Sequence, residues 1–147
     1  MKMKVIALLL AAVLSTCALA APDAGRLPAI VRSGFAAYKA DGAQAAINAW
    51  MIGSPIAQTE QAQHEVHALR HFESQFRNYQ DFHVVRIVSI SPTTQMLYVQ
   101  LDYINGPGFG KFLVYQAGES WNVISFSFGD DPEVLWGFSL FGAQDMQ

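Results

Sequence analysis

The sequence has little cysteine and little charge, and both shortages limit what the protein can do. Among its 147 residues Cys17 is the single cysteine, so the chain can form neither an internal disulfide nor a metal site with several thiolates. Only 14% of the residues are charged, whereas 52% are hydrophobic. The stability of the fold must therefore come from the packing of apolar side chains.

The chain also lacks an apolar run long enough to cross a membrane. Its most apolar stretch, residues 5–14, has 10 residues, whereas about 20 are needed to span a bilayer. Lys2 and Lys4 precede this stretch and Ala18-Leu19-Ala20 follows it, which completes the three parts of a secretory signal peptide. We therefore predict a signal peptide at residues 1–20 and export to the periplasm or the extracellular space, without stable membrane insertion.

Cleavage after Ala20 leaves one domain, residues 21–147, which is long enough to bury a core of its own. Thr16 stands where a bacterial lipoprotein signal usually has Gly, Ala or Ser, so lipid anchoring at Cys17 is not predicted. Without Lys2 and Lys4 the mature chain has 7 basic and 12 acidic residues. This acidic balance makes nucleic acid and anionic membrane surfaces poor partners.

The hydrophobic pattern changes from helical to strand-like near residue 80. Three helices are predicted at residues 27–40, 43–52 and about 58–77, with Asp41 as the N-cap of the second. Four strands follow at residues 81–90, 94–104, 110–117 and 120–128, and their short connections favour an antiparallel meander. The predicted fold class is α+β, with the helices preceding a curved four-stranded sheet.

Large apolar side chains continue beyond the last predicted strand. The tail contains Leu135, Trp136, Phe138 and Phe141 but has a less regular pattern. Such residues are predicted to cover a sheet edge or the surface of a partner.

Three histidines in the third predicted helix raise the question of a metal site. His64, His67 and His71 lie within about 60° of one another on a helical wheel, and the apolar stripe lies on the opposite side. The segment does not match either metalloprotease pattern, because Ala68 stands where one pattern requires His and Arg70 stands where the other requires Glu. We interpret the histidines as an exposed polar face, and no metal or other cofactor is predicted.

Glu65 falls inside the apolar stripe of the same helix. A carboxylate does not belong unpaired in a dry core, so Glu65 either forms a salt bridge with Arg86 or Lys111 or extends from near the helix start into water. An alternative is that Glu65 is the polar group of a pocket between helix and sheet, where apolar neighbours raise its pKa.

The segment NGPGFGKF, residues 105–112, does not fit a phosphate-binding loop. Asn105 stands at the position of the first glycine, Phe112 replaces the Ser or Thr after Lys111, and no helix follows. The segment is predicted to contain a glycine-rich hairpin turn in which Phe109 forms a lip over a pocket.

One face of the second predicted strand mixes aromatic, amide and carboxylate groups. It carries Tyr98, Gln100 and Asp102, and antiparallel sheets commonly expose such a face to water. If the sheet curls, the same side chains line a cavity, with Asp102 and Glu65 as candidate acid and base. Trp121, which opens the last strand, is a further candidate lining residue.

The order of the elements and the run FLVYQAGESWNVISFSF resemble exported members of the nuclear transport factor 2-like superfamily. The resemblance rests on Phe112, Val114 and Tyr115, on Gly118 in the turn, and on the strand that Trp121 opens. It implies a curved sheet that wraps a long helix around a pocket, often in a homodimer. Superfamily members include isomerases, dehydratases and proteins without catalytic activity, and no catalytic residue of theirs matches a position here, so the resemblance implies no reaction.

The sequence thus supports three functional hypotheses. The first is an exported protein that binds a small apolar molecule or a peptide between the long helix and the sheet, with Glu65, Tyr98, Gln100, Asp102 and Trp121 as lining residues. The second is an isomerase or dehydratase that uses Glu65 or Asp102 as general base. The third is a non-catalytic interaction or dimerisation module that docks through its aromatic tail.

Overall fold

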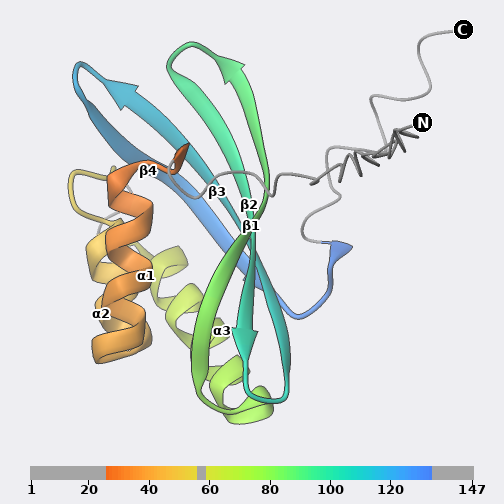
Figure 1. Cartoon of the computed structure of the whole chain (residues 1–147). Helices are drawn as coiled ribbons and strands as arrows, with labels where there is room; N and C mark the ends of the chain where they lie inside the picture. The colour runs from red at the N-terminus through yellow and green to blue at the C-terminus, as the bar shows by residue number, and fades with distance from the viewer. Residues whose placement is uncertain (1–25, 56–58, 134–147) are drawn as a thin grey trace, which may run out of the picture.

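A computed structural model describes residues 26–55 and 59–133 of the chain. Three helices precede an open four-stranded antiparallel sheet, which confirms the predicted α+β class (Figure 1). The predicted signal peptide, Cys17 and the aromatic tail lie outside the described residues. Within the described residues, no helix combines the length and the apolar character that crossing a bilayer requires. The elements are α1 (Ala29–Asp41), α2 (Ala43–Trp50), α3 (Glu60–Phe76), β1 (Tyr79–Ser91), β2 (Thr94–Tyr103), β3 (Gly106–Ala117) and β4 (Ser120–Gly129).

Helices α1 and α2 form a tight antiparallel pair. The predicted N-cap was wrong, because Asp41 is the last residue of α1, and Gly42 makes the turn with a φ of 85°. Glycine adopts this left-handed backbone without steric cost, so the chain reverses within one residue. The pair is held by Trp50, whose indole fills the space beside Gly34 and donates a hydrogen bond of 3.0 Å to the carbonyl of Val31.

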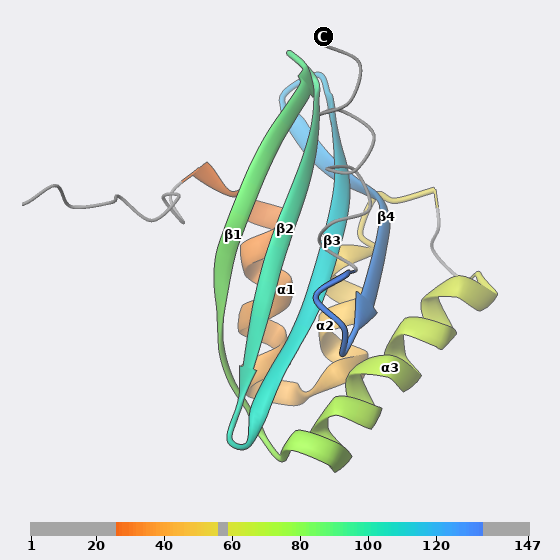
Figure 2. The same cartoon turned by 90° about the vertical axis from the view of Figure 1, so that its right-hand side faces the viewer.

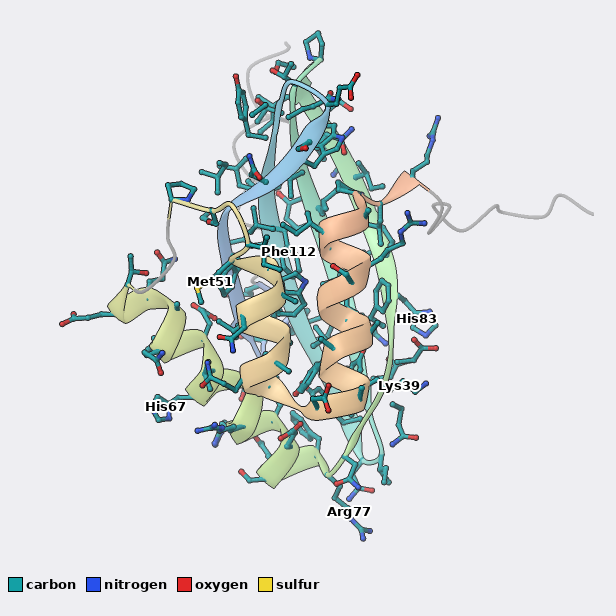
Figure 3. The ribbon with its side chains drawn as sticks, turned by 90° about the vertical axis from the view of Figure 1, so that its left-hand side faces the viewer. Lys39, Met51, His67, Arg77, His83 and Phe112 are labelled. Carbon is teal, nitrogen blue, oxygen red and sulfur yellow. The ribbon has the colours of Figure 1, made fainter. Side chains whose placement is uncertain are left out.

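The third helix turns its apolar stripe toward the sheet, as its periodicity predicts. Thr59 caps its start by accepting a hydrogen bond from the backbone N–H of Ala62. His64, His67 and His71 are all exposed, which confirms the predicted polar face, and Figure 3 shows His67 pointing away from the body of the protein. In the described part of the chain, no three His, Asp or Glu side chains come together as a metal site would require.

The strands pair in chain order, β1-β2-β3-β4. The predicted glycine-rich turn was too long, because β3 begins at Gly106 and the turn contains only Ile104 and Asn105. Phe109 therefore lies within β3, paired with Gln100 of β2, and does not form a lip above a turn.

The glycines of this segment make room for aromatic rings on the helix side of the sheet. A Cβ atom at Gly108 would lie 2.9 Å from the ring of Phe72 in α3, and one at Gly110 would lie 2.7 Å from the ring of Phe128 in β4. Real Cβ atoms do not approach other atoms so closely, so glycine is required at these two positions for the rings to pack in the core.

Helices α1, α2 and α3 all lie on one face of the sheet, and none of the three lies on the other face, here called the outer face (Figure 2). The core between helices and sheet is strongly aromatic. Its largest fully buried side chains include Trp50 of α2, Phe35 of α1 and Phe112 of β3, and Figure 3 shows Phe112 between the two helices and the sheet. The rings of Phe35 and Phe82 stack with centroids 4.0 Å apart. Aromatic side chains from both layers therefore pack against one another between the helices and the sheet.

Candidate functional site

The five predicted lining residues lie on opposite sides of the sheet. Side chains alternate along β2, and Leu101 and Tyr103 belong to the core, so Gln100 and Asp102 project from the outer face. Tyr98 shares that face. Glu65 of α3 and Trp121, which packs against the core, lie on the helix side. The two carboxylates of the hypothetical acid and base therefore do not meet in one cavity.

Glu65 is buried and fixed to the edge strand of the sheet. Its side chain is about 5% exposed, and its Oε2 accepts a hydrogen bond of 2.9 Å from the backbone N–H of Phe128 in β4. Burial raises the pKa of Glu65, while the bond from Phe128 and the imidazole of His64, 3.5 Å from Oε1, oppose the rise. The predicted salt bridge with Arg86 or Lys111 was wrong, because both of these side chains stand in the row of Tyr98 on the outer face.

Glu65 belongs to a set of three side chains that cover the free edge of β4. Ser54, after α2, donates a hydrogen bond to the carbonyl of Val123, and Gln61 of α3 donates one of 3.5 Å to the carbonyl of Phe126. Together with Glu65 they satisfy backbone groups on the side of β4 away from β3. An edge covered in this way cannot readily accept another strand.

The opposite edge of the sheet is protected by irregularity. Pairing of β1 with β2 shifts register at three places, between Tyr79 and Asp81, between Val84 and Arg86, and between Ser89 and Ser91. Such bulges interrupt the regular row of N–H and C=O groups that an added strand needs. Both edges are therefore poor places for a partner to extend the sheet.

The outer face carries a polar cluster that the sequence did not reveal. Nε2 of His83 in β1 lies 2.7 Å from Oδ2 of Asp102, and Nε2 of Gln100 donates a hydrogen bond of 2.8 Å to Oδ1 of the same carboxylate. His83 is 64% exposed, and Figure 3 shows it projecting from the β1 side of the molecule. Gln100 and Asp102 were predicted from strand alternation, whereas His83 joins them only through the pairing of His83 with Gln100.

The polar cluster can bind a ligand but lacks the parts of a known catalytic device. Asp102 contacts one nitrogen of the exposed His83 imidazole, and the second nitrogen can form a hydrogen bond with a ligand. Among the described residues, no serine, threonine or tyrosine hydroxyl forms a hydrogen bond with His83. A carboxylate and a single imidazole also fall short of the three protein ligands of a typical zinc site.

Next to the polar cluster the outer face is apolar and aromatic. Met96 of β2 pairs with Val88 of β1 and Leu113 of β3, and these three side chains form a half-buried row across the sheet. Tyr98 stands between this row and the polar cluster. Its exposed fraction is only 5%, although it does not belong to the core cluster on the helix side.

A second group of buried polar side chains lies on the helix side, where three tyrosines meet. The hydroxyls of Tyr38 and Tyr103 are 3.0 Å apart, and the hydroxyl of Tyr38 also donates to the carbonyl of Leu69. Burial raises the pKa of Tyr38, Tyr79 and Tyr103. These contacts use the hydroxyls to join α1, α3 and β2, so the group stabilises the fold.

Comparison with known proteins adds no identification, since no family model, no curated protein and no solved structure matches the chain. The candidate site therefore rests on the geometry of the outer face alone.

Proposed function

We propose that the protein is a non-catalytic binding module that holds an apolar peptide segment against the outer face of its sheet. The observation that carries the proposal is the side-chain ladder of β2, in which Met96, Tyr98, Gln100 and Asp102 follow one another on one face. Such a surface offers apolar contact at one end and hydrogen-bonding groups at the other. Binding sites commonly combine these two elements.

The length of the ladder favours a peptide over a compact small molecule. Alternate residues of a strand are about 6.8 Å apart, so the four side chains from Met96 to Asp102 extend over about 20 Å. A peptide of six or so residues in an extended form covers a surface of that length. The polar cluster of His83, Gln100 and Asp102 would bind polar groups of the peptide backbone at one end.

Two features of the helix side support this choice over a pocket between α3 and the sheet. Phenylalanine rings occupy the space beside the glycines of β3, and the Glu65 carboxylate is already bound to the N–H of Phe128. The separation of Glu65 from Asp102 likewise gives no support to an isomerase or dehydratase that needs both carboxylates.

The proposal retains two expectations from the sequence. The module acts outside the cytoplasm after cleavage at Ala20, and its fold is of the nuclear transport factor 2-like kind. Both are independent of the binding surface. Protein recovered from the exported fraction should begin at Ala21, as its intact mass would report.

The test is native mass spectrometry of the protein recovered from its exporting compartment without a histidine tag. Wild type is compared with Leu113→Glu, which places a charge in the apolar row, and with Ile52→Glu, a matched control at a side chain that is 71% exposed after α2. We expect a peptide adduct on wild type and on the control, and its loss from Leu113→Glu. An adduct that survives Leu113→Glu would place binding elsewhere, and bare masses for all three proteins would overturn the proposal.

A further inference from the structure

We propose that the C-terminal segment of this same chain, residues 134–147, occupies the outer face of the sheet and competes there with other ligands. This inference rests on the proposed function, because it assigns an occupant to the same surface. The described chain ends at Glu133, and 14 residues follow it.

The composition of the segment suits the surface. Its 14 residues include Leu135, Trp136, Phe138, Leu140 and Phe141. A soluble chain rarely leaves so many large apolar side chains in water without a surface to cover. The apolar row of Val88, Met96 and Leu113 is the complementary surface on the described part of the sheet.

The burial of Tyr98 indicates that this surface is not open to water. Tyr98 lies on the face opposite α1, α2 and α3, yet its exposed fraction of 5% is that of a core residue. Its cross-strand neighbours are the cations Arg86 and Lys111. The chain from Asp130 onward contains only acidic charges, including Asp145, so the charges of segment and surface are complementary.

The segment also begins in the right place. Gly129, the last residue of β4, pairs with Phe109, and Phe109 pairs with Gln100 on the same outer row. Tyr98 stands two strands away, about 10 Å at the usual strand spacing. A chain of 14 residues reaches up to about 46 Å, so the segment can cross the sheet with length to spare.

Both edges of the sheet are protected, which favours the outer face as the surface that the segment covers. The sequence suggests that the aromatic tail covers either a sheet edge or a partner's surface. Ser54, Gln61 and Glu65 already cover the edge of β4, and the bulges of β1 interrupt the other edge. Within residues 26–55 and 59–133, the outer face has neither covering side chains of this kind nor such bulges.

An occupant in the same chain would weaken the binding of an added peptide, because the peptide binds only the fraction of molecules whose face is open. Removing the contacts of the segment should therefore raise peptide occupancy. It should also expose Met96, whose thioether is oxidised faster when solvent reaches it.

The experiment measures hydrogen peroxide oxidation of Met96 in the full-length mature protein. The tail variant replaces Trp136, Phe138 and Phe141 with serine. Met51, which packs against the core from the helix side, is the internal control and reports any loss of folding. We expect the oxidation rate of Met96 to rise several-fold in the tail variant while that of Met51 stays constant.

Other outcomes would overturn the inference. An unchanged rate for Met96 would show that the segment does not cover it. Protection of Met96 that grows with protein concentration, together with a dimer mass, would identify a second copy as the occupant. The peptide proposal is judged separately by native mass spectrometry: exposure of Met96 without any peptide adduct on the tail variant would leave the inference standing and remove the proposed function.

Discussion

Replacement of Glu65 tests how a buried carboxylate joins α3 to the edge of the sheet. Glu65→Gln keeps an oxygen that can accept from the N–H of Phe128 and removes the charge, whereas Glu65→Leu removes the acceptor as well. A buried backbone donor without a partner costs about 1–3 kcal/mol. We therefore expect Glu65→Leu to be less stable than Glu65→Gln by about 1–3 kcal/mol at every pH. At about 4 °C for each kcal/mol, a thermal melt resolves this difference.

The dependence on pH distinguishes the charge from the hydrogen bond. Because burial raises the folded-state pKa of Glu65 above its ordinary 4.5, the folded protein holds this proton more tightly than the unfolded chain does. The stability that the protonated carboxyl contributes is complete below the unfolded-state pKa and is lost as the pH rises through the folded-state pKa. Wild type should therefore match Glu65→Gln in acid and fall below it at neutral pH.

The assay is thermal unfolding followed by circular dichroism from pH 4 upward, with wild type, both variants and His64→Ala as a control for the exposed imidazole neighbour. All proteins share the remaining carboxylates, so differences between the curves isolate Glu65. Equal stability of Glu65→Leu and Glu65→Gln would refute the role of the Phe128 bond. A constant difference between wild type and Glu65→Gln across the pH range would refute the raised pKa.

Substitutions at five further positions test the fold around the site. Because His67 and His71 are exposed, replacing both with Ala should change the unfolding free energy by less than about 0.5 kcal/mol, and a loss on the scale of a core truncation would show that the helix faces otherwise. Gly34→Ala should lower the free energy of unfolding by about 2–4 kcal/mol in chemical denaturation, since its Cβ would overlap the buried indole of Trp50. Gly118→Ala is the control, because Gly118 has open space around it and a φ of 64°, and it should cost about 1–2 kcal/mol. Equal costs for the two variants would contradict the packing of Trp50 on Gly34. Tyr38→Phe should cost about 1–2 kcal/mol by removing its hydroxyl contacts, and an unchanged melting temperature would argue against them.

The α+β class followed from the sequence, because periodicity is a local property. Apolar residues recur about every 3.6 residues in a helix that packs on one face and every two residues in a strand, so the spacing of apolar residues indicates the element. The exposed face of α3, with His67 and His71, was predictable for the same reason. So was the shared face of Tyr98, Gln100 and Asp102, since alternation along one strand needs no partner.

Local signals failed where a residue serves a distant part of the chain. Gly106 and Gly108 suggested a turn, but the rings of Phe76 and Phe72 explain both glycines. Asp41 has a side chain suited to an N-cap, but it is the last residue of α1, and Gly42 occupies the N-cap position of α2.

Only the tertiary structure decided which polar groups meet. The partner of Glu65 is a backbone N–H some sixty residues away. Almost every residue has a backbone N–H, so the sequence does not indicate which one binds Glu65. His83 reaches Asp102 because β1 and β2 pair in one register, and a shift by one residue would turn His83 to the other face. Sequence determined the faces of each element through local geometry, whereas strand register and layer packing determined the site, because these depend on contacts summed over the whole core.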